Sequence, residues 1–183
     1  GMSLLVVGFF GIWVLDDFKA ATAALASETF SATSSYSMSV IPLFILMGNI
    51  AGQAGYSQRL YESAHAWVGH LRGGLASATI LGCASFAAVS GSSVATAVTI
   101  GKVALPEMKR YGYSDGLATG SVAAGGTLGI LIPPSTGFVL YAILTEESIG
   151  KLFMAGILPG LLLTLLFIVV IYITTLIKPQ GSS

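Results

Sequence analysis

Hydroxyl side chains gather around two places where the chain cannot continue a regular helix. The first is the turn Ser90-Gly91-Ser92-Ser93, and the second is the pair Pro133-Pro134. The hydroxyls nearest to these two breaks belong to Ser90, Ser92, Ser93, Thr96, Thr127, Ser135 and Thr136. Neutral oxygens of this kind suit a monovalent hard cation, whereas divalent cations usually recruit carboxylates. The two breaks together therefore predict a sodium site, with these ligands: Ser90, Ser92, Ser93, Thr127 and Gly129.

The same breaks would expose helix ends. Helix N-termini favour anions, and unwound carbonyls favour cations. We therefore predict that an anionic substrate contacts the breaks at Gly91, Pro134, Ser135 and Thr136. One alternative stays open for each hydroxyl, because Ser and Thr in apolar helices often donate to a carbonyl of their own helix.

Other kinds of chemistry find little support. No Asp, Glu or His lies within residues 74–100 or 117–145, so a proton relay is disfavoured relative to sodium coupling. Ser90 and Ser92 have no base near them in sequence, which disfavours an intramembrane hydrolase. His65 and His70 are five residues apart and do not share a helix face, which disfavours a metal site. We expect no enzyme activity.

The first break lies between two short apolar segments. Gly74–Val89 and Val94–Leu105 would form helices of about 16 and 12 residues, or roughly 24 and 18 Å. Neither length crosses a hydrocarbon core of about 30 Å comfortably. The pattern predicts a re-entrant hairpin that ends at Pro106, followed by a loop over Glu107–Gly116. Irregular backbone survives at membrane depth only when it is buried in protein or lines a wet cavity.

The second break interrupts the apolar stretch Leu117–Leu144. Pro133 and Pro134 have no N–H, so the carbonyls of Gly129 and Ile130 would lack their helical donors. We predict a discontinuous transmembrane helix.

The remaining apolar segments predict ordinary helices. Leu152–Ile177 is long enough to span a membrane, and Ser39–Ala54 becomes long enough if it extends upstream through Ser31–Met38. Glycines four residues apart predict close helix packing in both: Gly156 with Gly160, and Gly48 with Gly52.

Gly55–Arg72 has a different pattern. Its apolar residues recur at helical spacing and predict an amphipathic helix at the membrane surface: Tyr56, Leu60, Ala64, Trp67 and Leu71.

Composition agrees with a membrane protein. The 183 residues are 54% hydrophobic and 9% charged, with no net charge, and the mean hydropathy is +0.85. A soluble domain carries roughly 25% charged residues. The zero net charge gives no reason to expect a nucleic-acid partner, and Cys83 as the only cysteine excludes an internal disulfide. Ser3–Leu15 is too short to span the bilayer, and we expect the chain to be a fragment.

The hairpin returns to its own side of the membrane, which assigns a side to each charge. Six of the eight basic residues then share one side, which is cytoplasmic by the positive-inside rule: Arg59, Arg72, Lys102, Lys109, Arg110 and Lys178. Lys19 and Lys151 fall on the other side.

Several long stretches resemble the large membrane subunit of TRAP (tripartite ATP-independent periplasmic) transporters: residues 41–48, 86–96, 104–108, 125–135 and 148–160. The resemblance implies half of an inverted-repeat permease that works by an elevator motion and is coupled to sodium. It implies a small membrane subunit and a periplasmic binding protein as partners. It also implies C4-dicarboxylates, sialic acids or related carboxylates as substrates, and a bacterial or archaeal inner membrane that the chain crosses several times.

We therefore expect an all-α membrane protein with three parts. Residues 1–72 form scaffold helices and the amphipathic interfacial helix, residues 73–147 form the hairpin and the broken helix, and residues 148–183 form a transmembrane helix. The alternatives are a structural or assembly subunit and another sodium–carboxylate carrier family with similar hairpins, whose Ser-Asn-Thr tip motif is absent here.

Overall fold

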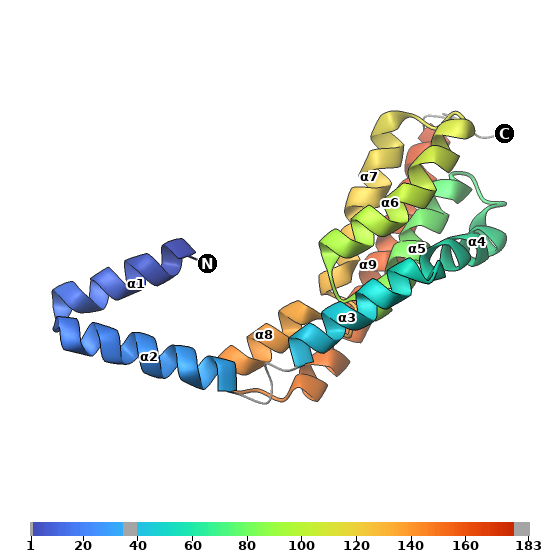
Figure 1. Ribbon diagram of the computed structural model, residues 1–183. Helices are drawn as coiled ribbons and strands as arrows, with labels where there is room; N and C mark the ends of the chain where they lie inside the picture. Colours follow the sequence, from blue (N-terminus) through green and yellow to red (C-terminus); the bar gives the residue numbers. More distant parts are fainter. Residues whose placement is uncertain (1, 35–39, 178–183) are drawn as a thin grey trace. The chain divides into compact units, whose positions relative to one another are not determined.

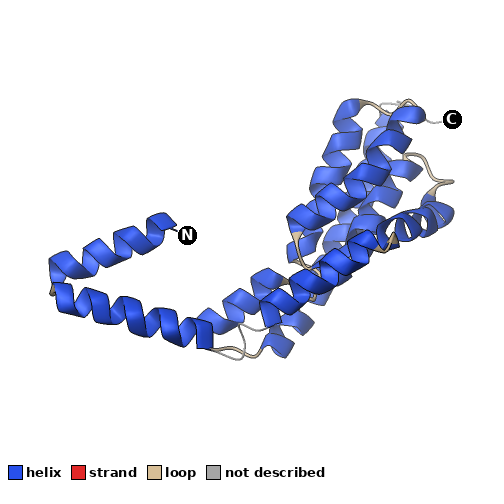
Figure 2. Cartoon of the chain, in the orientation of Figure 1, coloured by secondary structure: helices blue, strands red, loops and turns tan. Residues whose placement is uncertain are grey.

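The computed structural model describes residues 2–34 and 40–177 of the chain. Every regular element in these ranges is a helix, as Figure 2 shows, which confirms the all-α prediction. The chain divides into two compact units, Gly1–Val40 and Ile41–Ser183, and each is described by itself. The predicted boundaries near residues 72 and 147 both fall inside the second unit and stay predictions.

The first unit consists of two helices. α1 (Met2–Leu15) packs against α2 (Phe18–Ser34) through a short turn, in which the Asp17 carboxylate accepts a hydrogen bond from the N–H of Phe18 at 2.7 Å. Aromatic rings gather beside this turn, with the Trp13 and Phe18 ring centroids 5.3 Å apart. At about 1.5 Å per residue, the 14 residues of α1 span roughly 21 Å, which is shorter than a bilayer core.

The second unit is built around α5 (Gly74–Ser90). In Figure 1 this helix lies among α4 (Tyr56–Val68), α6 (Ser93–Arg110), α7 (Asp115–Thr127) and α9 (Ile149–Ile177), and it contacts all four. Twelve of its 17 residues are buried, and most of these are small. Small residues let neighbouring backbones approach closely. The unit therefore has its core along α5.

α5 and α6 form a helical hairpin, with Gly91 and Ser92 between them. That this hairpin is re-entrant stays a prediction. Its second arm is longer than predicted. α6 has 18 residues and continues through Pro106 to Arg110, so the expectation that the arm ends at Pro106 and that a loop begins at Glu107 is wrong. Proline removes only its own N–H bond to Lys102, and the helical ladder resumes where Tyr111 N–H donates to the Glu107 carbonyl at 3.1 Å.

The second predicted break is confirmed. α7 passes into a 3-10 turn, η2 (Leu128–Ile130), and helical structure resumes only at α8 (Thr136–Thr145). The residues between them contain Pro133 and Pro134, which cannot donate backbone hydrogen bonds. Figure 1 shows the change of course between α7 and α8.

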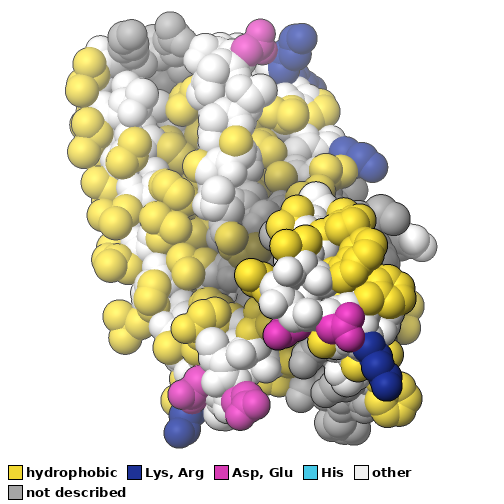
Figure 3. All heavy atoms as spheres, turned by 90° about the vertical axis from the view of Figure 1, so that its left-hand side faces the viewer, with side chains coloured by type: hydrophobic (Ala, Val, Ile, Leu, Met, Phe, Trp, Pro, Cys, Tyr) yellow, Lys and Arg dark blue, Asp and Glu magenta, His cyan; other side chains and the backbone are white. Residues whose placement is uncertain are grey.

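α9 is the predicted long apolar helix, with 29 residues and a mean hydropathy of 2.7 over its most apolar window. Among the described residues it is the one helix long and apolar enough to cross a membrane. Most of its large side chains are exposed, among them Leu158, Leu161 and Leu165. Figure 3 shows many hydrophobic side chains on the visible surface of the molecule, among white atoms of the backbone and of other side chains.

The glycine pair of α9 packs closely, as predicted. A Cβ on Gly156 would overlap the Phe138 ring of α8 and lie 2.9 Å from the Leu131 carbonyl oxygen. A Cβ on Gly160 would lie 2.8 Å from the Ile132 side chain. The pair therefore seats α9 directly against the interruption between η2 and α8.

α3 (Val40–Gln53) confirms packing at Gly48, where an added Cβ would lie 3.1 Å from the Ser90 Cα. The predicted upstream extension is not found as such, because Ser31–Ser34 belong to α2 and residues 35–39 lie outside the described residues.

The amphipathic pattern of α4 is only partly as expected. α4 buries Ser57, Tyr61 and Ala64, whereas Tyr56 and Trp67 are exposed, Trp67 by 81%. The helix therefore has a second, inward face that includes Tyr61, which the sequence pattern did not identify.

Candidate functional site

The hairpin tip and the interrupted helix meet at one junction. There the C-terminus of α5 at Gly91 and the N-terminus of α6 at Ser92 lie against the end of η2 and the N-terminus of α8 at Ser135. Two helix N-termini, which favour anions, therefore meet two helix C-terminal ends, which favour cations. The predicted ligands come from segments about 40 residues apart, and folding brings these segments together.

Hydrogen bonds from α8 hold the junction. The Gly91 carbonyl accepts from the Thr136 backbone N–H at 3.2 Å and from the Thr136 hydroxyl at 3.0 Å. The exposed carbonyl end of α5 is thereby satisfied by the donor end of α8. Gly91 and Thr136, both predicted substrate contacts, therefore have a demonstrated structural role.

Glycines allow the two backbones to touch. A Cβ on Gly129 would lie 2.6 Å from the Ser92 carbonyl oxygen, and a Cβ on Gly91 would lie 2.5 Å from the Pro134 carbonyl oxygen. Gly91 also has a φ of +59°, a left-handed conformation that glycine adopts without the Cβ penalty. The junction is thus a contact of main chain with main chain, and side chains contribute little to its closest approaches.

Ser92 and Ser135 cap the two new helices. The Ser92 hydroxyl accepts from Ala95 N–H, and the Ser135 hydroxyl accepts from Phe138 N–H, each at 3.4 Å. Ser135 also donates to the Ile130 carbonyl at 2.6 Å. The Ile130 carbonyl lacks its helical donor, as predicted, but it is not free, because the Ser135 side chain supplies another donor.

The predicted sodium ligands fall into two groups. Ser90 is buried at the tip, and its hydroxyl shares a 2.7 Å hydrogen bond with that of Thr96, which was not among the predicted ligands. Ser92 and Ser93 form the peptide that faces Gly129. Thr127 stands apart, because its side chain is exposed and its hydroxyl donates to the Ala124 carbonyl at 2.6 Å.

This donor set fits a monovalent cation better than a divalent one. The buried Ser90–Thr96 hydroxyl pair and the Ser92 carbonyl are neutral oxygens at the tip. Within the described ranges no group of three or more Asp, Glu, His or Cys side chains could hold a metal ion. A divalent ion would lack the carboxylates it usually recruits, whereas sodium would not need them.

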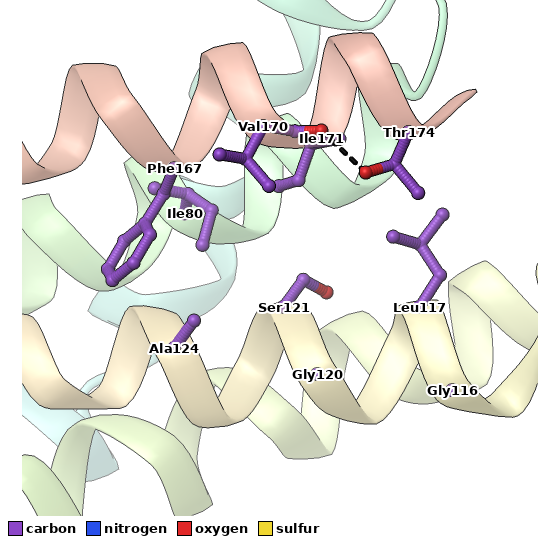
Figure 4. Close-up of a pocket in the computed structure, with 10 residues that line it drawn as sticks. All are labelled: Ile80, Gly116, Leu117, Gly120, Ser121, Ala124, Phe167, Val170, Ile171 and Thr174. Carbon is purple, nitrogen blue, oxygen red and sulfur yellow. Dashed lines mark hydrogen bonds between the residues drawn. The ribbon is translucent and has the colours of Figure 1, made fainter. Parts of the chain in front are cut away.

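The groove between α7 and α9 is a poor alternative site. It has a volume of about 160 Å³ and is lined by one residue of α5, five of α7 and four of α9 (Figure 4): Ile80, then Gly116, Leu117, Gly120, Ser121 and Ala124, then Phe167, Val170, Ile171 and Thr174. Its two hydroxyls already donate to their own helices, that of Thr174 to the Val170 carbonyl at 2.7 Å and that of Ser121 to the Ala118 carbonyl at 2.9 Å. A substrate site needs several convergent polar groups, which this groove lacks.

Thr136 allows a direct test of the junction. Thr136→Val removes the hydroxyl bond to Gly91 while keeping the backbone N–H bond, so we expect a loss of about 1 kcal/mol in unfolding free energy. Thermal unfolding of the purified chain in detergent micelles measures it. Thr145→Val is the matched control, because Thr145 is exposed and bonds its own helix at the Tyr141 carbonyl. Equal effects of the two changes would contradict a special role for the Thr136 hydroxyl.

A helical hairpin locked into an interrupted apolar helix is the arrangement typical of secondary transporters, whose sites form at broken helices. The model of the family described as tripartite ATP-independent periplasmic transporter, DctM component, matches residues 1–180, and the chain belongs to this family. The resemblance seen in the sequence is therefore confirmed.

Curated relatives agree on the family and differ in their printed substrates. The chain is 49% identical over 155 residues to the C4-dicarboxylate TRAP transporter large permease protein DctM of Pseudomonas aeruginosa, covering 85% of this chain and 36% of that protein. It is 45% identical over 138 residues to the isethionate TRAP transporter permease protein DctMQ of Oleidesulfovibrio alaskensis, covering 75% of this chain and 22% of that protein.

A third relative is the ectoine/5-hydroxyectoine TRAP transporter large permease protein UehC of Ruegeria pomeroyi. The identity is 36% over 170 residues, covering 93% of this chain and 40% of that protein. The chain thus spans between about a fifth and two fifths of the length of these three relatives.

Proposed function

We propose that this chain forms part of the permease of a sodium-coupled secondary transporter that imports small organic acids across the inner membrane. The observation that carries the proposal is the junction, where the hairpin tip accepts two hydrogen bonds from the restart of the interrupted helix. Irregular backbone is costly in lipid, because each unsatisfied polar group costs several kcal/mol. A purely structural subunit needs only uninterrupted spanning helices, so two helix interruptions in contact with each other favour a transporter.

Sodium is the proposed coupling ion. This chain is proposed to supply part of the sodium site from the hydroxyl pair of Ser90 and Thr96, the Ser92–Ser93 peptide and Gly129. Thr127 joins this set only if its side chain turns away from the Ala124 carbonyl. The substrate is proposed to lie beside the N-termini of α6 and α8, close to Pro134 and Ser135, where the partial positive charge of both helix ends favours an acid group.

Relatives named for C4-dicarboxylate, isethionate and ectoine support a small organic acid in general, with C4-dicarboxylates as the first substrates to test. The proposed partners are a small membrane subunit, a periplasmic binding protein that delivers the substrate, and the lipid bilayer.

The orientation in the membrane is proposed from the charges in the sequence. The side of the membrane that carries six of the eight basic residues would be the cytoplasmic side, and the hairpin would enter the membrane from that side. An elevator movement of the hairpin and broken helix is proposed from the family resemblance. Family membership excludes a different sodium–carboxylate carrier family.

Sodium dependence of uptake tests the proposal. In the complete permease, reconstituted in liposomes with its partners, uptake of labelled C4-dicarboxylates should require an inward sodium gradient, and a potassium gradient should not replace it. Ser90→Ala removes a buried hydroxyl at the tip and should raise the half-saturating sodium concentration about tenfold, which corresponds to about 1.4 kcal/mol.

Two matched variants sharpen this test. Thr127→Ala should have a smaller effect than Ser90→Ala, because the Thr127 hydroxyl is exposed and bonded to its own helix. Thr145→Ala, in α8 and also bonded to its own helix, should leave sodium dependence unchanged. Uptake that proceeds equally without sodium, with normal amounts of protein in the membrane, would refute sodium coupling.

A further inference from the structure

α3 reaches the hairpin tip through a glycine that is not part of the junction. A Cβ on Gly48 would lie 3.1 Å from the Ser90 Cα, 3.3 Å from the Ser90 carbonyl oxygen and 3.6 Å from the Ser90 Cβ. All three atoms belong to one residue of the tip, and α3 and the hairpin belong to the same compact unit. The α3 backbone therefore lies directly against Ser90.

Ser90 joins the two arms of the hairpin at this point. The residue is 3% exposed, and its hydroxyl shares a 2.7 Å hydrogen bond with the hydroxyl of Thr96, which is fully buried in α6. Ser90 is the last residue of α5, so this bond connects the two arms next to the tip. The position of the Ser90 backbone therefore decides how the two hydroxyls are oriented.

The tip has little freedom to move away from α3. After Ser90, the Gly91 carbonyl accepts two hydrogen bonds from Thr136, and the Ser92 carbonyl lies close to Gly129. A methyl group added to Gly48 would meet backbone atoms of Ser90, which cannot rotate out of the way as the end of a long side chain can. Contacts of 3.1 and 3.3 Å require a displacement of a few tenths of an ångström, and part of it would fall on Ser90.

Gly52 differs from Gly48, although the sequence pattern groups the two glycines as one packing pair. Gly52 follows one turn later in α3, and a Cβ there would lie 3.8 Å from the Phe86 ring, which is an ordinary van der Waals distance. Alanine in place of Gly52 would therefore fit without displacing the hairpin. Of these two glycines, only Gly48 is required by its contact with the tip.

We infer that Gly48 is a positioning residue for the proposed sodium site. It supplies no ligand to the ion, but it lets α3 form a wall that holds the Ser90 backbone, and this wall sets the geometry of the Ser90–Thr96 hydroxyl pair. Binding groups must be held within about 0.5 Å of their productive geometry, so a displacement of a few tenths of an ångström is enough to weaken ion binding. The inference rests on the proposed sodium coupling, and it extends the site to α3.

Sodium affinity in the complete permease tests this role. With the permease and its partners reconstituted in liposomes, Gly48→Ala should raise the half-saturating sodium concentration about threefold, and Gly48→Val should raise it further. The KM for labelled C4-dicarboxylate at saturating sodium should stay unchanged, because the atoms nearest to the added methyl group belong to Ser90 and not to the proposed substrate contacts. A merely destabilising change would lower the amount of permease and leave the half-saturating sodium concentration unchanged.

Two comparisons show whether the effect passes through Ser90. Gly52→Ala is the matched control and should leave the half-saturating sodium concentration unchanged, because its methyl group fits. In a Ser90→Ala background the hydroxyl is already absent, so Gly48→Ala should have a much smaller effect than in the wild-type permease. Changes at independent sites add, whereas changes at residues that act through one another do not.

A disulfide measures the contact without any transport. In the purified chain, Cys83→Ala removes the only cysteine, and Gly48→Cys with Ser90→Cys places two Cβ atoms 3.6 Å apart, within the usual disulfide range of about 3.5–4.5 Å. Oxidation with copper phenanthroline, followed by mass spectrometry, should therefore show rapid cross-linking. Gly52→Cys with Ser90→Cys should cross-link more slowly, since a Cβ on Gly52 would have no Ser90 atom within 4 Å.

The possible failures are distinguishable. Uptake by the wild-type permease that does not depend on sodium would refute the proposed function, and this inference with it. Sodium-dependent uptake in which Gly48→Ala behaves like Gly52→Ala, or in which Gly48→Ala and Ser90→Ala act additively, would overturn the role of Gly48 alone. Equal cross-linking of the two cysteine pairs would overturn the contact itself.

Discussion

Gly129→Ala should abolish uptake by the complete permease and destabilise the chain by about 3 kcal/mol, the upper end of the usual cost of overpacking. The added Cβ would lie 2.6 Å from the Ser92 carbonyl oxygen, 2.7 Å from the Ser92 carbonyl carbon and 2.8 Å from the Ser93 nitrogen. All three are backbone atoms of the hairpin tip, so no flexible side chain can move aside. The measurements are thermal unfolding in micelles and uptake in liposomes.

Gly120→Ala is the matched control. Gly120 lies in α7, the helix that leads into η2, but a Cβ there would meet no atom within 4 Å. Alanine in a helix is favoured over glycine by roughly 0.5–1 kcal/mol, so this change should leave stability equal or slightly higher. If Gly129→Ala behaved like Gly120→Ala, the close contact between η2 and the hairpin tip would be refuted.

Gly91→Ala should be the most destabilising single methyl addition at the junction, at about 4 kcal/mol. One part of this cost is the left-handed backbone at φ +59°, which costs an L-residue about 1–2 kcal/mol. The other part is the overlap of the new Cβ with the Pro134 carbonyl oxygen at 2.5 Å. Separation of these atoms would also strain the two Thr136 hydrogen bonds, so uptake should be lost as well.

Gly112→Ala separates the two parts of this cost. Gly112 has a φ of +73°, similar to that of Gly91, but an added Cβ there would meet no atom within 4 Å. The change should therefore cost only the backbone strain of about 1–2 kcal/mol and leave uptake intact. Equal destabilisation by Gly91→Ala and Gly112→Ala, measured by thermal unfolding, would mean that the contact with Pro134 contributes nothing.

The sequence predicted the breaks well, because each break follows from a local property. A Ser-Gly-Ser-Ser turn and two adjacent prolines interrupt helices whatever surrounds them, and both interruptions are found. Pro106 shows the limit of this reasoning. A single proline removes one hydrogen bond, and the intact ladder around it carries α6 on to Arg110.

The site was predicted less completely, because pairing of polar groups depends on contacts between distant segments. The missing backbone donor at Ile130 was correctly inferred, but its replacement by the Ser135 hydroxyl depends on the course of the chain after the prolines. The burial of Tyr61 on the inward face of α4 was missed for a similar reason, because it depends on the helices that pack against α4. The sequence pattern had also placed Glu107 in a loop, whereas α6 continues through it.

The main-chain character of the junction has a consequence for how such a chain can diversify. The closest contacts of Gly91 and Gly129 are with backbone atoms of Pro134, Ser92 and Ser93, and every residue type supplies the same carbonyl. Hydroxyls other than those of Ser135 and Thr136, which donate to backbone carbonyls at the junction, can therefore be exchanged for other side chains without changing these closest contacts. Substitutions of these side chains can therefore change which substrate or ion is bound while the contact between the hairpin tip and the interrupted helix stays the same, provided that Gly91 and Gly129 are kept.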